Sequence, residues 1–301
     1  MLCARMVVRS SCGACFMLCA SGWAATVYTN DFQGPPGSSY PEWTGGLYTY
    51  TGNQAGTIRA GSGSQKIANV DSANGRQRFL GEFGGPAILT SPPYDPQHFT
   101  RVDQSVRLTL NNLAPHALVT VAFDLYILKS WDGNNPNYGP DRWKFSVVGG
   151  PTPVDATFSN NFKTDPYDLS LQDYPLAGVP PQTRAAAVNT LGYSFYGDSA
   201  YHIASVFPHS EDSLALEFSS SLFEGKGLED ESWGLDNVVV SIDSPTASVT
   251  ESVVNVPSRL AGIASGAWVT ILGDFRSTSS GRATSDSQRH GGASGPAKTL
   301  P

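Results

Sequence analysis

Residues that could bind a metal ion are concentrated in one loop of the sequence. Between an apolar segment ending near Leu128 and another starting near Trp143, the chain reads Ser130-Trp131-Asp132-Gly133-Asn134-Asn135-Pro136-Asn137-Tyr138-Gly139-Pro140-Asp141. Carboxylate and amide oxygens are hard ligands that suit Ca²⁺. The spacing is not that of an EF-hand, because Pro136 occupies a ligand position and the late glutamate is missing. We expect Asp132, Asn134 and Asp141 to order this loop, either around Ca²⁺ or by capping their own backbone.

The same loop carries two flat aromatic rings. A sugar ring can stack on Trp131 or Tyr138, and Asn137 adds a polar group beside Tyr138. The competing interpretation is a long turn in which Trp131 belongs to the core. The sequence thus predicts ligand binding at Trp131, Asn137 and Tyr138, and exposure of the rings in a groove would decide between the two interpretations.

A second acidic segment, Glu229-Asp230-Glu231-Ser232-Trp233-Gly234-Leu235-Asp236, leads into the last apolar strand. In an alternating strand, Asp236 shares a face with Val238 and Val240. A carboxylate on a buried face must be paired, hydrogen-bonded or bound to metal. Asp31 is a candidate partner, because the first and last strands of a jelly roll commonly lie side by side. We expect Asp31 and Asp236 to hold one structural Ca²⁺, the alternative being an Asp236 bonded to backbone amides.

The elements that position these residues read as strands. Val119, Val121, Phe123, Leu125 and Ile127 alternate with more polar residues, and similar alternation recurs from residue 26 to about residue 243. Turn signals such as Gly45-Gly46 and Gly149-Gly150-Pro151 separate the segments. Strands without intervening helices predict an all-β, two-sheet antiparallel jelly-roll sandwich. Trp143 and Trp233 are expected in its core.

The two ends of the chain differ from this middle part. Residues 1–25 contain a basic start, a short apolar core and a small-residue cleavage region, which predicts a secretory signal peptide. All four cysteines lie within that segment, so the expected domain, residues 26–245, has none. Residues 246–301 form a low-complexity tail, and their apolar stretch, 260–273, is shorter than a membrane span of about 20 residues. We expect a secreted or cell-surface protein without an integral membrane span.

The charge of the chain restricts the classes of molecule that it can bind. The 301 residues carry a net charge of −7, and residues 26–245 hold 23 acidic and 12 basic side chains, a balance of −11. A domain this acidic repels phosphate backbones, which disfavours nucleic acid. Cations and neutral molecules such as sugars remain suitable partners, and an extracellular glycan or cell-surface polysaccharide is expected.

Several motifs together resemble a known family. They are Phe123-Asp124-Leu125-Tyr126, Ser130-Trp131-Asp132-Gly133-Asn134, Gly139-Pro140-Asp141 with Trp143, Thr157-Phe158-Ser159-Asn160, and Asp230-Glu231-Ser232-Trp233-Gly234-Leu235-Asp236-Asn237-Val238. The set is similar to bacterial exported proteins that combine a signal peptide, a jelly roll like those of concanavalin-like lectins and carbohydrate-binding modules, and often a PEP-CTERM sorting tail. Related jelly rolls are stabilised by calcium bound near the first and last strands, which implies Asp31 and Asp236 here.

The tail departs from that family pattern. A Val-Pro-Glu-Pro motif would be expected, whereas Val256-Pro257 is followed by Ser258 and Arg259. The tail is either a degraded sorting signal or the product of a reading-frame error. Plain secretion is therefore expected in place of surface anchoring.

The concanavalin-like fold also hosts glucanases, which need two carboxylates flanking the scissile bond. An acid–x–acid–x–acid strand is absent from this sequence, and Asp124 is flanked two positions away by Ala122 and Tyr126. We therefore predict a non-catalytic protein that binds glycans and holds structural calcium. The alternatives are a secreted glycoside hydrolase or lyase with its acids on different strands, and a purely structural extracellular matrix protein.

Overall fold

The computed structural model describes residues 17–19, 24–54, 57–85, 100–162, 169–194, 196–224, 227–243 and 270–272. The chain divides into two compact units, Trp23–Pro245 and a unit that joins Met1–Gly22 to Thr246–Pro301. In the latter, strand β1 (Met17–Cys19) pairs antiparallel with β15 (Thr270–Leu272). Most of the expected signal peptide and tail lies outside the described residues. None of the helices described is long and apolar enough to cross a membrane.

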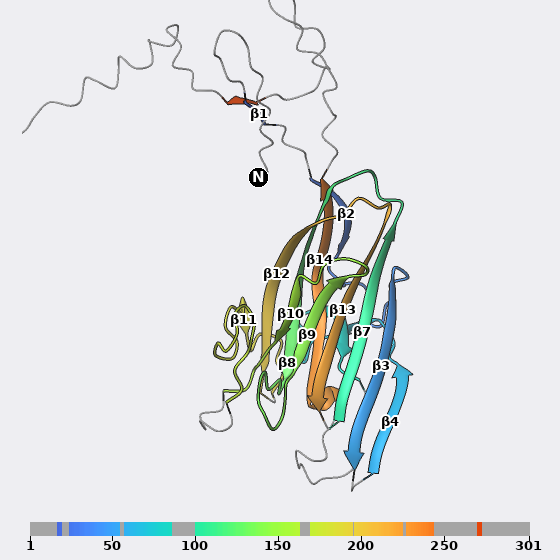
Figure 1. The fold of residues 1–301 in the computed structure, drawn as a ribbon. Helices are drawn as coiled ribbons and strands as arrows, with labels where there is room; N and C mark the ends of the chain where they lie inside the picture. Colours follow the sequence, from blue (N-terminus) through green and yellow to red (C-terminus); the bar gives the residue numbers. More distant parts are fainter. Residues whose placement is uncertain are drawn as a thin grey trace, which may run out of the picture. The chain divides into compact units, whose positions relative to one another are not determined.

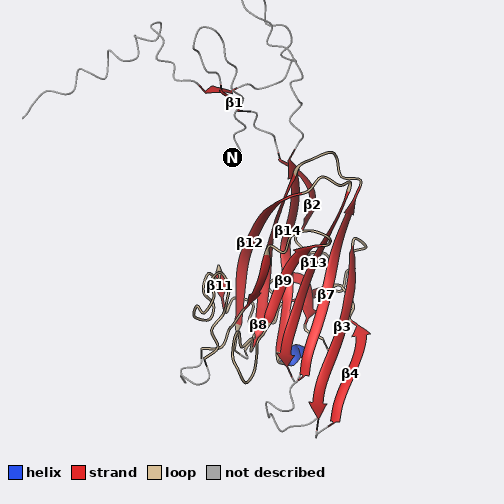
Figure 2. Cartoon of the chain, in the orientation of Figure 1, coloured by secondary structure: helices blue, strands red, loops and turns tan. Residues whose placement is uncertain are grey.

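The first sheet of Trp23–Pro245 has six strands, all paired antiparallel (Figures 1 and 2). Their order is β10 (Val154–Thr157), β9 (Arg142–Val147), β13 (Ser213–Glu224), β7 (Thr100–Asn111), β3 (Trp43–Gln54) and β4 (Thr57–Ser64). The long strands β13 and β7 form its centre, and β13 also pairs with β9.

The second sheet has seven strands, also paired antiparallel. Six follow the order β11 (Ala187–Val188), β12 (Asp198–Pro208), β8 (Leu118–Lys129), β14 (Glu231–Asp243), β6 (Arg78–Phe83) and β5 (Asn69–Asp71). The seventh, β2 (Ala24–Asn30), pairs with the second half of β14, whereas β6 pairs with the first half. A short 3₁₀ helix, Gly227–Glu229, precedes β14. The first and last strands of the sandwich therefore lie side by side, as predicted.

Hydrophobic residues from both sheets form one core. The alternating residues of β8, from Val119 to Ile127, are fully buried there. Aromatic rings fill the space between the sheets, and the Phe123 ring meets that of Phe218 edge-on at 5.3 Å. Trp143 and Trp233 have no exposed surface, so their predicted place in the core is confirmed. The predicted all-β, two-sheet antiparallel sandwich is likewise confirmed.

One detail of the last strand differs from the prediction. Asp236 lies opposite Asp124 of β8, and Val239 lies opposite Ala122, so β14 contains one extra residue in this interval. This bulge includes Asn237, whose φ is 50°. A bulge reverses the alternation of side chains beyond it. Asp236 therefore points to the outer face of the sheet, whereas Val238 belongs to the core, and the predicted shared face is wrong.

Candidate functional site

Three carboxylates converge inside the sandwich. Asp132 follows β8, Asp141 precedes β9, and Glu231 begins β14. They are at most 7% exposed, and one oxygen of each lies within 4.8 Å of the others. The structure therefore brings together two of the acids predicted from the loop and adds Glu231, to which the sequence assigned no role.

Hydrogen bonds fix the two aspartates of this acidic cluster. Asp141 Oδ2 accepts from the backbone N of Asp132 at 2.5 Å, and its Oδ1 accepts from the backbone N of Phe223 at 3.0 Å. Asp132 Oδ1 accepts from Ser170 Oγ at 3.2 Å and from Asn161 Nδ2. The loop is thus tied to β13 and to the segment around residue 170.

A glycine allows the loop to pack this closely. Gly133 has a φ of 61°, and a Cβ at this position would lie 2.2 Å from the backbone oxygen of Leu171. A larger residue would therefore push the segments around Asp132 and Ser170 apart.

The predicted ligand Asn134 is exposed, and its Nδ2 donates to Asp173 Oδ1 at 2.6 Å.

Burial makes negative charge costly in the acidic cluster. Desolvation, followed by the negative charge of Asp132, raises the pKa of the Asp141 carboxyl well above its ordinary value. Three buried carboxylates at this separation are stable when protons or a cation compensate their charge. An all-oxygen set of carboxylates is the kind of site that Ca²⁺ takes.

Asp236 and Asp31 have different surroundings. Asp236 Oδ2 accepts from Gln77 Nε2 at 2.7 Å and from Tyr126 OH at 3.0 Å, and its Oδ1 accepts from its neighbour's backbone N. Burial raises the pKa of Asp236 to about 6. Asp31 is exposed, and its Oδ1 accepts from the backbone N of Gln33 at 3.2 Å. A calcium ion shared by Asp31 and Asp236 stays a prediction.

The predicted sugar platform at Trp131 is wrong. Trp131 has no exposed surface, and its indole Nε1 donates to the backbone oxygen of Ser232 in β14 at 2.9 Å. A ring buried in this way cannot stack on a ligand, and the core interpretation of Trp131 is correct.

Asn135 Oδ1 accepts from the backbone N of Asn137 and of Tyr138, so part of the loop is a turn capped by its own side chain. Asn137 is exposed and Tyr138 is half-buried.

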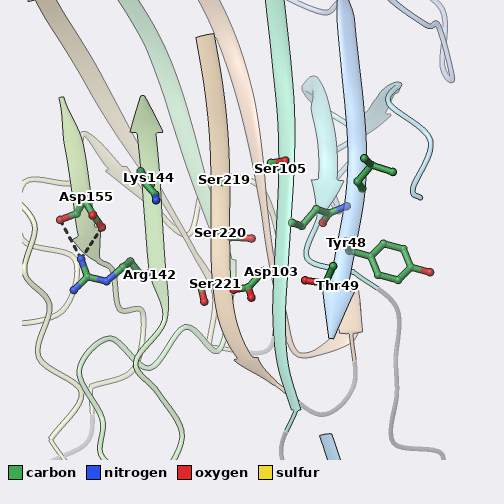
Figure 3. Close-up of a pocket in the computed structure, with 12 residues that line it drawn as sticks. Tyr48, Thr49, Asp103, Ser105, Arg142, Lys144, Asp155, Ser219, Ser220 and Ser221 are labelled. Atoms are coloured by element: carbon green, nitrogen blue, oxygen red, sulfur yellow. Dashed lines mark hydrogen bonds and ion pairs between the residues drawn. The ribbon is translucent and has the colours of Figure 1, made fainter. Parts of the chain in front are cut away.

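A different surface offers a place for a ligand. An open groove of about 520 Å³ lies on the outer face of the six-stranded sheet (Figure 3). It is lined by Leu47, Tyr48, Thr49, Asp103, Gln104, Ser105, Arg142, Lys144, Asp155, Ser219, Ser220 and Ser221. The sequence did not predict this groove, because its residues come from five strands spread between Leu47 and Ser221.

The strand register explains why the sheet is hollowed here. Paired residues share a face, so the outward side chains form two rows across the strands. One row is Leu47, Ser105, Ser219, Lys144 and Asp155, and the next is Thr49, Asp103, Ser221 and Arg142. Serines form the floor where the rows cross β13, and the longer Lys144 and Arg142 form the wall on β9. A serine-x-serine segment facing an arginine-x-lysine segment is the signal that could have revealed it.

Ion pairs border the groove. Arg142 Nη1 bonds Asp155 Oδ1 at 2.6 Å on the β9–β10 side. Arg107 and Glu217 form an ion pair at 2.7 Å, one row beyond the floor on the same face. At the opposite end, Arg101 Nη1 donates to Ser221 Oγ at 2.7 Å. The groove is therefore polar and charged on several sides.

Comparisons of the chain with protein-family models, with characterised proteins and with solved structures found no match.

Proposed function

We propose that the protein is a secreted, non-catalytic β-sandwich that binds a glycan in the groove of its six-stranded sheet and is stabilised by calcium. The groove carries the proposal. Its size falls within the usual range of ligand sites, about 300–1,000 Å³. Its floor presents the hydroxyls of Ser105, Ser219 and Ser221, which can donate to or accept from sugar hydroxyls. The resemblance of the sequence to exported jelly-roll proteins agrees with this proposal.

The carboxylates of the groove favour binding over hydrolysis. Asp103 lies on β7 and Asp155 on β10, with β13 and β9 between them. Three strand spacings separate their strands by about 14 Å. The two carboxyl groups of a glycosidase lie about 5–9.5 Å apart. Asp155 is moreover bonded to Arg142 in the ligand-free structure.

Calcium is assigned to the acidic cluster of Asp132, Asp141 and Glu231. Asp132 and Asp141 come from the two ends of one loop and Glu231 from β14, and each of these acids alone would be costly to bury. A divalent cation compensates their charge and links the loop after β8 to β14. Its role is structural, because the groove lies on the opposite side of the sheet from these inward-facing residues.

Binding of immobilised glycans by the full chain, followed by calorimetric titration with the glycan retained, tests the proposal. Ser219→Trp fills the floor and should lower affinity at least about tenfold, since a sugar hydroxyl site is lost and the groove is blocked. Ser213→Trp is the matched control, because Ser213 faces outward from the same strand beyond the groove. Equal affinity of the two variants would place the ligand elsewhere, and no glycan binding at all would favour the structural alternative.

A further inference from the structure

We infer that the glycan of this groove is anionic and carries carboxylate or sulfate groups that Lys144 and Arg142 bind. The inference rests on the proposed function, because it names the chemical class of the same ligand. It follows from the charged residues of the groove and from its floor, whose described residues are serines and not aromatic residues.

Lys144 is a cation available to a ligand. It is exposed and makes no hydrogen bond or ion pair with any residue that the structure describes. Its neighbours across the strands are Ser219 and Asp155, and the carboxylate of Asp155 is already bonded to Arg142. An anionic group over Ser219 could therefore take up the Lys144 ammonium and the serine hydroxyl together.

The groove differs in charge from the chain as a whole. Around the floor stand Arg101, Arg107, Arg142 and Lys144, and the acids beside them are Asp103, Asp155 and Glu217. The residues that line the groove hold two cations and two acids, a balance of zero, and the bordering Arg101, Arg107 and Glu217 bring the balance to +1, whereas the chain carries −7. Arg107 and Arg142 are paired with Glu217 and Asp155, so Lys144 is the cation through which this face can attract an anion despite the acidic remainder.

The floor offers no stacking surface for a neutral sugar. Its centre is made of serines, and the one aromatic residue among the described lining residues is Tyr48. Tyr48 is paired with the inward-facing Gln104, and Figure 3 shows its ring beside β3, away from the serines. Stacking on aromatic faces cannot supply the affinity here, so charge and hydrogen bonds must supply it. Because Lys144 makes no ion pair with a described residue, its charge is available for this purpose, which favours an anionic ligand.

Arg142 and Lys144 set the spacing that the ligand must match. They stand two residues apart on β9 and point outward together, which separates their Cα atoms by about 6.6 Å. Arg142 can exchange its bond to Asp155 for a planar carboxylate or a sulfate, both of which suit the guanidinium fork. A chain with charged groups on successive sugars could thus meet both side chains.

Calorimetric titration of the full chain with three probes tests the inference: an oligouronate, the same oligosaccharide with its carboxyls reduced, and a sulfated oligosaccharide. We expect the oligouronate or the sulfated probe to bind at least about tenfold more tightly than the reduced one, and the tighter of the two identifies the anionic group. Lys144→Gln should remove most of that difference, and Lys144→Arg should retain it. Arg76→Gln is the control, since it removes the same charge from an exposed loop outside the groove.

Each contrary result has a distinct meaning. If the reduced probe binds as tightly as the charged ones, the inference fails and the proposed function stands. If none of the probes and no other glycan binds, the proposed function fails as well. If a short single-stranded oligonucleotide binds as tightly as the oligouronate, the groove is a general polyanion site and the inference of a glycan is overturned.

Discussion

Asp141 and Arg142 are adjacent in the chain and serve opposite sides of the sheet. Asp141 points inward, has no exposed surface and belongs to the acidic cluster, whereas Arg142 points outward into the groove and bonds Asp155. The backbone of Phe223, two residues after Ser221 of the groove floor, donates to Asp141. The acidic cluster and the groove therefore share the ends of β9 and β13.

Calcium should stabilise the protein through Glu231. In thermal unfolding of the full chain, Ca²⁺ should raise the melting temperature by several degrees relative to EDTA, because a ligand that binds only the folded state stabilises it by about 2.7 kcal/mol at a hundred times its Kd. Glu231→Gln should abolish that shift. Glu229→Gln, at an exposed position two residues earlier, should retain it. If Ca²⁺ raises the melting temperature of Glu231→Gln by the same amount, the ion does not bind at this cluster.

The Asp31–Asp236 prediction has its own test in the same assay. If those residues bind calcium, Asp236→Ala should abolish the calcium shift. If the ion lies in the acidic cluster alone, Asp236→Ala should lower the melting temperature through the lost bonds to Gln77 and Tyr126, and the shift should persist. We expect the second result, because Asp236 lies on the outer face of the sheet and its oxygens already accept three hydrogen bonds.

Asp236 should make stability depend on pH. Its pKa is about 6 in the folded protein and 3.8 as its ordinary value, so the folded state binds the proton more tightly. Stability contributed by this group is therefore greatest below pH 3.8 and declines as the pH rises to about 6. The unfolding free energy of the wild type minus that of Asp236→Asn, measured in EDTA, should fall across this interval. A constant difference would contradict the raised pKa.

The sequence predicted the sandwich better than the sites. Alternation along β8 located its core face, because this strand is regular from end to end. The same rule failed at Asp236, since one extra residue at Asn237 reverses the face and no pattern of apolar residues signals it. Glu231 was not assigned a role because it follows two acids, and only the fold brings it beside Asp141. Trp131 was placed at the surface, although a loop that folds back buries it.

The bulge itself can be tested at Asn237. Its φ of 50° lies in the left-handed region, and its Nδ2 donates to Asp124 Oδ2 at 2.8 Å. Asn237→Gly and Asn237→Ala both remove that hydrogen bond, but only alanine meets the steric cost of the left-handed conformation. The alanine variant should be less stable than the glycine variant by about 1 kcal/mol in denaturant unfolding. Equal stabilities would mean that the strand avoids this conformation.

The acidic cluster and the groove share the ends of β9 and β13. We therefore predict that calcium and the oligosaccharide each raise the affinity of the protein for the other. Without a cation, repulsion among Asp132, Asp141 and Glu231 should displace the start of β9, and with it Arg142. Titration with the oligosaccharide that binds should therefore give a Kd several-fold lower in Ca²⁺ than in EDTA, and Glu231→Gln should remove this dependence.

Linkage requires the reciprocal effect, in which the oligosaccharide lowers the Kd for Ca²⁺ by the same factor. Lys144→Gln provides the control, because it should weaken the oligosaccharide while leaving the calcium shift of the melting temperature intact. Equal oligosaccharide affinities in Ca²⁺ and EDTA, in a wild type whose melting temperature responds to calcium, would show two independent sites. Because Asp141 and Arg142 are joined by a single peptide bond, we expect coupling.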